Sequence, residues 1–294
     1  TLILSQTDHS HLKLSDPNYK QIPENFIPPS KYGKAVTPVN LKEALNNPNA
    51  YTGANFNNSG LTTVPEEIFQ FPNLIEIDLS HNSISSLPPR FTELKNLKDL
   101  HVNNNRLTSL GTEITSCLNL EKLQIQNNPL ISISKDIGNM KNLKELWIER
   151  TDKKCTVPPE IWNLFNLQKL HLIDVNLKTI PMGISEMKKL NELCLSHNSI
   201  SSVPEEIFQL KNLTYLNLGY NVISSISPSI KNLKNLDYFG IYGNPVSTLP
   251  VEIQRLKNLS FLSCWNTNLQ KTEIESLKKS LPQAEIHDSD KDIH

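Results

Sequence analysis

Cysteine is sparse in this sequence, and no two cysteines lie close together. The four thiols stand alone along the chain, at Cys117, Cys155, Cys194 and Cys264. Without CxxC or CxC pairs, neither a zinc finger nor a compact disulfide framework is predicted. Isolated thiols of this kind usually behave as small apolar side chains. Glycine is scarce too, with 9 among 294 residues, which is unusual for an ordinary α/β enzyme.

Charge of one sign and long apolar runs are also missing. The chain has 29 basic and 30 acidic residues, a net charge of −1, so no nucleic-acid partner is predicted. No apolar run approaches the roughly 18 residues that span a bilayer. The first ten residues lack the basic flank and long apolar core of a signal peptide. No GxSxG, HExxH, P-loop or GxGxxG motif occurs, so neither an enzyme nor a cofactor is predicted.

What the chain contains is a repeat. Residues 77–97 and 193–213 keep Leu, Asn, Ile and Pro at matching places, 116 residues apart. The same spacing recurs along most of the chain in steps of 23 residues, with one step of 24 between Asn142 and Asn166. The units begin at Ala50, Asn73, Asn96, Asn119, Asn142, Asn166, Lys189, Asn212, Asn235 and Asn258. Periods of this length predict stacked units that share one core.

The consensus of the units is N-L-x-x-L-x-L-x-x-N-x-I-x-x-L-P-x-x-I-x-x-L-K. It resembles the leucine-rich repeat family in its 23-residue form with an LPxxI segment. The L-x-L part suits a short strand with both leucines pointing inward, and successive units stack these strands in parallel. We therefore expect an α/β fold, a horseshoe-shaped leucine-rich repeat solenoid. Its concave side is a parallel β-sheet, its convex side is irregular or 3₁₀ because of the recurring proline, and its ends carry helical caps.

The tenth position of the unit is Asn in six units: Asn82, Asn105, Asn128, Asn198, Asn221 and Asn244. The resemblance implies that these amides bond to the backbone of neighbouring turns and satisfy buried polar groups. Thr151 and Val175 interrupt the series on either side of the 24-residue unit. We therefore expect a local irregularity at residues 150–156.

Four regions are expected along the chain. Residues 1–39 are Pro-rich in part and read as an irregular arm, and residues 40–49 form an N-terminal helical cap with Asn40 at its start. Residues 50–269 form ten repeats. Residues 270–294 form a C-terminal cap in which Thr272 starts a helix, Pro282 ends it, and AEIH adds an edge strand. Both ends resemble 23-residue repeat proteins of bacteria, notably secreted or surface proteins of spirochaetes.

Aromatic residues gather at the C-terminal end of the predicted concave face, and Trp147 lies on the same face nearer its middle. We expect a protein partner to bind there, because Tyr and Trp bury a large area at low entropic cost. Nearby glycines, Gly219, Gly240 and Gly243, are expected to leave grooves beside the rings. Two alternatives are that the rings seal the C-terminal cap or join a homodimer through this end. The candidate partner-binding residues are Trp147, Tyr215, Tyr220, Tyr238, Tyr242, Phe261 and Trp265.

Two polar groups on the same face are weak candidates for zinc. His171 and Cys194 are expected side by side on neighbouring strands, with His197 following on the second. The other group comprises Asp78, His81, Asp99 and His101. A histidine on such a face is more often a solvated contact residue, so no metal is predicted at either place.

The sequence predicts a non-enzymatic protein-binding module. The resemblance implies a bacterial protein that is exported, secreted or on the cell surface, where it contacts host or surface proteins. The alternatives are a cytoplasmic scaffold, since the LPxxI unit also resembles Ras-suppressor-type repeats, and a zinc-binding repeat protein. A leader peptide or lipidated cysteine in the full-length gene product would separate the first two.

Overall fold

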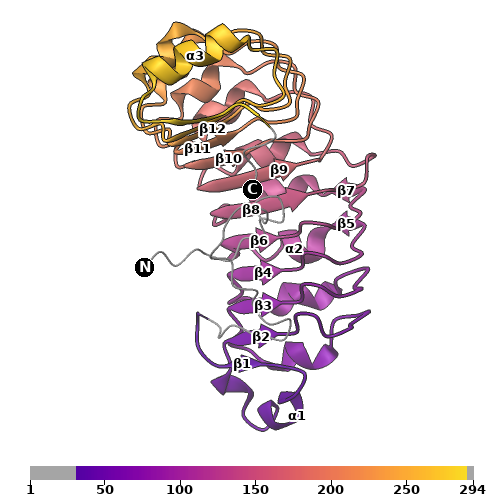
Figure 1. Cartoon of the computed structure of the whole chain (residues 1–294). Coiled ribbons are helices and arrows are strands. Elements are labelled where there is room, and N and C mark those ends of the chain that lie inside the picture. The colour runs from indigo at the N-terminus through magenta and orange to yellow at the C-terminus, as the bar shows by residue number, and fades with distance from the viewer. Residues whose placement is uncertain (1–30, 290–294) are drawn as a thin grey trace.

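Each repeat unit folds into one turn of a solenoid, with a strand on one side and a 3₁₀ helix or a short α-helix on the other (Figure 1). The computed structural model describes residues 31–289. Most of the arm expected at residues 1–39 therefore lies outside the described residues, as do the last five residues. The stacked turns form a curved body in which the sheet lines the concave face (Figure 1).

Within residues 31–289, the concave sheet contains twelve strands, and every neighbouring pair among them is parallel. Ten of the strands belong to the ten repeat units, and one more is added at each end. The strands in spatial order are β1 (Ala35–Val36), β2 (Gly53–Asn55), β3 (Glu76–Asp78), β4 (Asp99–His101), β6 (Lys122–Gln124), β8 (Glu145–Glu149), β9 (Lys169–Ile173), β10 (Glu192–Cys194), β11 (Tyr215–Asn217), β12 (Tyr238–Gly240), β13 (Phe261–Ser263) and β14 (Glu285–His287).

The convex side has short helical turns, as the recurring proline predicts. Six of these prolines stand directly before a 3₁₀ helix, where a fixed φ and a missing N–H cost nothing. Two units also carry a short strand before the helical turn, and these strands, β5 (Ser109–Leu110) and β7 (Ser132–Ile133), pair in a two-stranded sheet. After β5 the helical turn is the α-helix α2 (Thr112–Thr115). The 3₁₀ helices of the repeats are η2 (Glu66–Gln70), η3 (Pro89–Glu93), η4 (Lys135–Asn139), η5 (Pro159–Asn163), η6 (Met182–Glu186), η7 (Glu205–Gln209), η8 (Pro228–Asn232) and η9 (Val251–Arg255).

One continuous apolar core runs through the stack between the two sides. Both inward residues of the L-x-L segment are buried in each unit, as at Leu216 and Leu218, and the convex isoleucine, such as Ile207 or Ile230, is buried behind them. Each unit buries these side chains only against its neighbours, so the stability of the fold is cooperative along the stack.

The asparagine series confirms the role implied by the resemblance. Asn221 is typical: its Nδ2 donates to the carbonyls of Leu195, Leu218 and Gly219 at 3.0, 3.0 and 3.2 Å. Its Oδ1 accepts the N–H of Ile200 at 3.0 Å. The other five asparagines repeat this arrangement. Buried backbone groups that the irregular turns leave unpaired are satisfied in this way.

The irregularity expected at residues 150–156 is present. Strands β8 and β9 have five residues where the other repeat strands have three, because they stay paired as far as Glu149 and Ile173. Backbone pairing thus continues where the asparagine is missing, and Arg150 N donates to Ile173 O at 2.8 Å. The extra residue is absorbed in the following turn, in which Cys155 N donates to Asp152 O at 2.8 Å.

The N-terminal end departs from expectation in two respects. The arm is not irregular throughout, because Ala35–Val36 forms β1 and extends the main sheet beside β2. Helix α1 (Leu41–Ala44) is followed by the 3₁₀ helix η1 (Pro48–Ala50). Asn40 does not cap α1 with its side chain; its Oδ1 accepts the N–H of Thr37 at 2.7 Å and ties the preceding turn.

The C-terminal cap consists of α3 (Lys271–Ser280) and the edge strand β14, which pairs with β13 as predicted. The helix starts two residues earlier than expected, with Gln270 rather than Thr272 at the N-cap, so Thr272 lies inside it. Leu277 and Leu281 are buried against the last repeat. The cap thereby covers the apolar end that an open stack leaves exposed.

Candidate functional site

Three aromatic rings stand side by side at the C-terminal end of the concave face. Tyr215, Tyr238 and Phe261 occupy the same register position on β11, β12 and β13. The centroids of the first two rings are 4.3 Å apart and those of the second two are 5.6 Å apart, and both pairs are nearly parallel. Side chains in register on parallel strands are held at about the strand spacing, which brings the rings to stacking distance.

A second aromatic group lies four or five residues further along the chain, just beyond the ends of the same strands. Tyr242 and Trp265 stack with centroids 5.3 Å apart and planes 5° apart. Tyr220 meets both rings edge-on, at 5.4 and 5.5 Å. All six side chains of the two groups are half-buried. We call these six residues the aromatic surface.

The three nearby glycines do not leave grooves, and this expectation was wrong. Each glycine is covered by a ring: a Cβ at Gly219 would come within 2.3 Å of Tyr242, one at Gly240 within 3.0 Å of Tyr238, and one at Gly243 within 2.5 Å of Tyr220. Because glycine has no side chain, each ring packs directly against the backbone at these positions. The aromatic surface is therefore a packed layer on the sheet.

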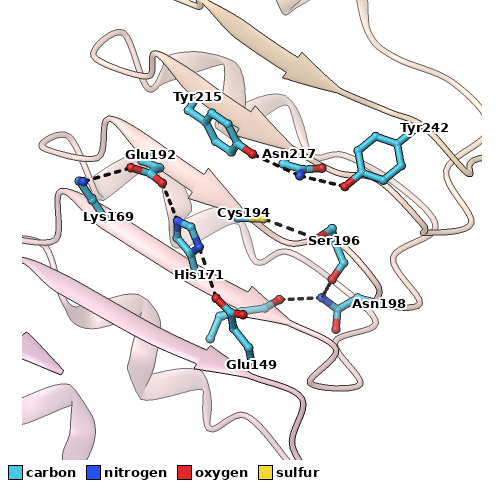
Figure 2. Close-up of polar contacts among 11 residues, drawn as sticks. Glu149, Lys169, His171, Glu192, Cys194, Ser196, Asn198, Tyr215, Asn217 and Tyr242 are labelled. Carbon is cyan, nitrogen blue, oxygen red and sulfur yellow. Dashed lines mark hydrogen bonds and ion pairs between the residues drawn. The ribbon is translucent and has the colours of Figure 1, made fainter. Parts of the chain in front are cut away.

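Hydroxyl groups of this layer converge on Asn217, the last residue of β11. Asn217 Nδ2 donates to the hydroxyls of Tyr242 and Tyr215, at 3.1 and 3.4 Å (Figure 2). Its Oδ1 accepts the N–H of Gly219 at 2.9 Å. Burial raises the pKa of Tyr215 and Tyr238 well above the ordinary range and that of Tyr242 to about 12. The hydroxyls stay protonated and the rings are fixed in orientation.

Tyr220 is held in a strained backbone conformation. Its φ is 49°, in the left-handed region that Asn and Gly tolerate best. The equivalent position of the next unit is Gly243 and that of the last is Asn266. Placing a tyrosine there costs about 1 kcal/mol, which the contacts of its ring with Tyr242 and Trp265 offset.

Charged residues dominate the face of the earlier repeats, and many are paired with one another. Lys122 and Glu145 approach within 3.7 Å on β6 and β8, and Lys169 and Glu192 within 3.4 Å on β9 and β10. In these ion pairs, the charge of a side chain on one strand is balanced by the opposite charge of a side chain on the next strand. Such exposed or half-exposed pairs contribute little to stability.

Trp147 does not join the aromatic surface, although the sequence grouped it with the other six residues. It lies on β8, three strands before β11, and it is buried. Its ring packs on His171 of β9 with centroids 3.6 Å apart. Its indole Nε1 has no hydrogen-bond partner among the described residues.

His171 lies between two carboxylates (Figure 2). Its Nε2 is 2.8 Å from Glu192 Oε1, and its Nδ1 is 3.7 Å from Glu149 Oε1. Burial alone lowers the pKa of His171, but the two carboxylates outweigh it and raise the pKa above 6.5. A raised folded-state pKa means that this pairing stabilises the fold fully below pH 6.5 and is lost as the pH rises through the raised value.

The zinc candidates on these strands do not gather. His171 and Cys194 are register partners on β9 and β10, but His171 is engaged with carboxylates, and Cys194 Sγ lies 3.5 Å from Ser196 Oγ. Burial raises the pKa of Cys194 to about 12, so the thiol is protonated and is a poor metal ligand or nucleophile. His197 is exposed and packs beside Tyr220, with ring centroids 4.4 Å apart.

The second polar group has a different membership from that predicted. Ligand atoms of Glu76, Asp99 and His101 lie within 4.8 Å of one another, whereas Asp78 and His81 are outside this group. The ammonium of Lys31 is 2.6 Å from Asp99 Oδ2 and supplies a positive charge there. Within this group, the Asp99 carboxylate is thus already ion-paired with Lys31.

The roles of several residues on this face were not predicted from the sequence. Asn217 was not recognised as the group that orients two tyrosines. Glu149 and Glu192 were not linked to His171. A repeat register identifies which residues are neighbours, and such pairings follow from it only when each row is checked for complementary donors and acceptors.

Comparisons with known proteins also find leucine-rich repeats in this chain. The family model described as Leucine rich repeat matches residues 55–107, 165–223 and 188–246. No curated protein matches the chain significantly. Many solved structures do match.

Two plant receptor structures and one bacterial structure illustrate the match. The ectodomain of the Arabidopsis thaliana receptor kinase GASSHO1/SCHENGEN3, in complex with CASPARIAN STRIP INTEGRITY FACTOR 2, is 28% identical over 74% of this chain and 27% of its own, with a TM-score of 0.64. The plant peptide hormone receptor RGFR1 with RGF2 is 25% identical over 82% and 40%, with a TM-score of 0.66. The functional domain of InlJ from Listeria monocytogenes is 23% identical over 82% and 49%, with a TM-score of 0.65.

The chain spans less than half the length of each of these three structures. Within residues 31–289, no helix has the length and apolar character that crossing a bilayer requires. The repeat register, the solenoid with its concave parallel sheet, and the family matches together identify the chain as a member of the leucine-rich repeat family.

Proposed function

We propose that this chain binds a protein or peptide partner on its concave face, through the aromatic surface of β11, β12 and β13. The observation that carries the proposal is the packing of six half-buried rings into one layer, with hydroxyls oriented by Asn217. Rings that are already immobilised lose little entropy when a partner covers them. Tyr and Trp are also the residue types that carry most binding energy at interfaces.

The solved relatives support this proposal. The GASSHO1/SCHENGEN3 ectodomain and RGFR1 were each solved with a bound factor or hormone. The charged side chains on the earlier strands are already paired with one another, so they attract a partner less strongly. This favours the C-terminal end of the concave face as the place where a partner binds.

End-sealing accounts for only part of the aromatic surface. Phe261 and Trp265 lie 6.0 and 6.4 Å from His287 of the capping strand. The other four aromatic residues pack within the aromatic surface, on one another and on Phe261 and Trp265, and Tyr220 also packs beside His197. Self-association through this end is the remaining alternative, and the same experiment separates it.

The test compares the intact chain with a Tyr238→Ala/Tyr242→Ala variant and with Phe165→Ala, which alters an exposed aromatic residue outside the aromatic surface. The three proteins are used as bait with extracts of the source cells and of their surroundings. Partners are then purified and their dissociation constants measured. We expect the double variant to bind at least about 30-fold more weakly, as for a hot spot of 2 kcal/mol or more.

Melting curves and light scattering accompany the binding measurement. Unchanged binding with a strong loss of stability would favour cap sealing and contradict the proposal. A change from dimer to monomer without loss of a second protein would favour self-association. Loss of partner binding in a folded monomer supports the partner-binding function.

For location, we propose an exported bacterial protein, secreted or on the cell surface, that contacts host or surface proteins. Its support is the resemblance of the entry segment around α1 to such proteins, together with the similarity of the chain to the ectodomain of a membrane receptor kinase. Cell fractionation and surface labelling in the source organism test it. Recovery only from the cytoplasm would favour the intracellular scaffold instead.

A further inference from the structure

A row of lysine side chains runs along one edge of the C-terminal repeats. Each member is the last residue of its repeat unit, and each is exposed: Lys188, Lys211, Lys234 and Lys257. The row lies where the chain passes from the convex side to the sheet, as Lys211 does between η7 and β11. We call these four residues the lysine edge. In the earlier units the same position alternates between lysine and apolar residues, namely Lys95, Leu118, Lys141 and Phe165.

Asparagine side chains tie the backbone of the lysine edge together. Each asparagine directly follows one lysine of the row, and its Nδ2 donates to the carbonyl of the lysine one turn earlier. The three bonds are Asn212 to Lys188 O at 2.8 Å, Asn235 to Lys211 O at 2.8 Å and Asn258 to Lys234 O at 3.0 Å. Successive lysines therefore follow the spacing of the parallel sheet, about 4.8 Å, and the row is about 15 Å long. The bonds also occupy carbonyl oxygens that would otherwise repel an anion.

Opposite charge is sparse beside the lysine edge. Lys188 approaches Glu186 at 3.4 Å, and both side chains are well exposed. Lys211, Lys234 and Lys257 form no ion pair within residues 31–289. The unit at residues 212–234 contains no acidic residue at all. Three of the four ammonium groups are therefore left for an external anion.

The acidic residues of the convex side lie too far away to cancel this charge. Glu205 begins η7 and Glu252 lies in the first turn of η9, whereas the lysines follow the other end of each helix. At about 2 Å per residue, a five-residue 3₁₀ helix separates the two charges by about 10 Å. Exposed charges about 10 Å apart are largely screened at 0.1 M salt. Lys231 and Arg255, in the last turns of η8 and η9, add positive charge beside the row.

The geometry of the lysine edge fits a linear polyanion. No aromatic residue occupies the row from Lys188 to Lys257, so the bases of a nucleic-acid strand find no stacking platform there. None of the exposed large apolar side chains belongs to this part of the row, so it has no anchor for a lipid surface. A linear polysaccharide with sulfate or carboxylate groups carries its charges along a line, and one sugar residue is about as long as one step of the row.

We propose that the lysine edge binds a linear polysaccharide bearing sulfate or carboxylate groups, through the ammonium groups of Lys188, Lys211, Lys234 and Lys257. These residues lie outside the aromatic surface, so this site and the proposed protein contact are independent of each other. Binding releases counterions from the polymer and is therefore strongly salt-dependent.

Titration of labelled heparin with the full chain tests the proposal. Fluorescence anisotropy gives the dissociation constant at a series of NaCl concentrations for the wild type and for Lys211→Gln/Lys234→Gln/Lys257→Gln. We expect the variant to bind heparin at least about 10-fold more weakly at low salt. The slope of log affinity against log salt should fall by about 2, since each contact with a single-stranded polyanion contributes about 0.7. Replacement of the same three lysines by arginine keeps the charge and should keep the binding.

The matched control removes the same charge elsewhere. Lys42→Gln/Lys135→Gln/Lys178→Gln alters three exposed lysines outside the lysine edge and should bind heparin like the wild type. The Tyr238→Ala/Tyr242→Ala variant should do the same, which separates this site from the aromatic surface. Melting curves check that each variant is folded.

Three results would each overturn the proposal. The first is absence of heparin binding by the wild type, and the second is an equal loss in the glutamine variant and its control. The third is tighter binding of a DNA duplex or of phosphatidylglycerol vesicles than of heparin through the same three lysines.

Discussion

Replacement of Asn221 by Ala measures what the asparagine series contributes to stability. Asn221 is 5% exposed and makes four hydrogen bonds to the backbone. The three carbonyls that it serves keep another partner each: Leu195 O accepts from Asn198, Leu218 O from Asn244, and Gly219 O from the N–H of His197. The N–H of Ile200 has no second acceptor among the bonds of the described residues.

The magnitude follows from this accounting. One buried N–H left unpaired costs about 1–3 kcal/mol, and each weakened carbonyl adds a few tenths. We therefore expect Asn221→Ala to lower the free energy of unfolding by about 3 kcal/mol. Urea unfolding followed by circular dichroism measures this change, with the m-value reporting whether the transition stays cooperative.

Asn212→Ala is the matched control within the same unit. Its Nδ2 donates one bond, to Lys188 O at 2.8 Å, and that bond is exposed to solvent. A loss below about 1 kcal/mol is expected there. Equal losses for Asn212→Ala and Asn221→Ala would refute the reasoning, because burial of the amide would then contribute nothing.

Two further predictions concern the concave face. A Cβ at Gly219 would come within 2.3 Å of Tyr242, so Gly219→Ala should displace that ring, cost about 1–3 kcal/mol and shift the fluorescence of Trp265, whereas Gly183→Ala, with nothing within 4 Å, should do neither. His171→Gln removes a side chain whose raised pKa stabilises the fold below pH 6.5 and is lost above the raised value. The stability difference between the wild type and this variant should therefore shrink as the pH rises from 5 to 9 in urea titrations; a constant difference would contradict the pairing with Glu149 and Glu192.

The candidate site was only partly predictable from sequence. Repeat register alone places Tyr215, Tyr238 and Phe261 side by side, because a strict period puts equivalent residues on neighbouring strands. The same reasoning put Trp147 in the group by residue type, although it lies three strands before β11. It also predicted grooves at the three glycines, whereas a tyrosine ring packs against each of them. Ring direction depends on side-chain packing, which a linear pattern does not contain.

Sequence by itself determined the solenoid, its parallel concave sheet, the proline-led turns and the irregular unit near residue 150. These features are local, and each repeat unit carries the same sequence pattern for them. A wrong prediction in one unit is therefore corrected by its neighbours. Tertiary structure decided what occurs once: the extra strand β1, the pairing of His171 with two carboxylates, and the convergence of Tyr215 and Tyr242 on Asn217. Such contacts join side chains from different turns through their rotamers and burial, and these are settled only when the turns are stacked.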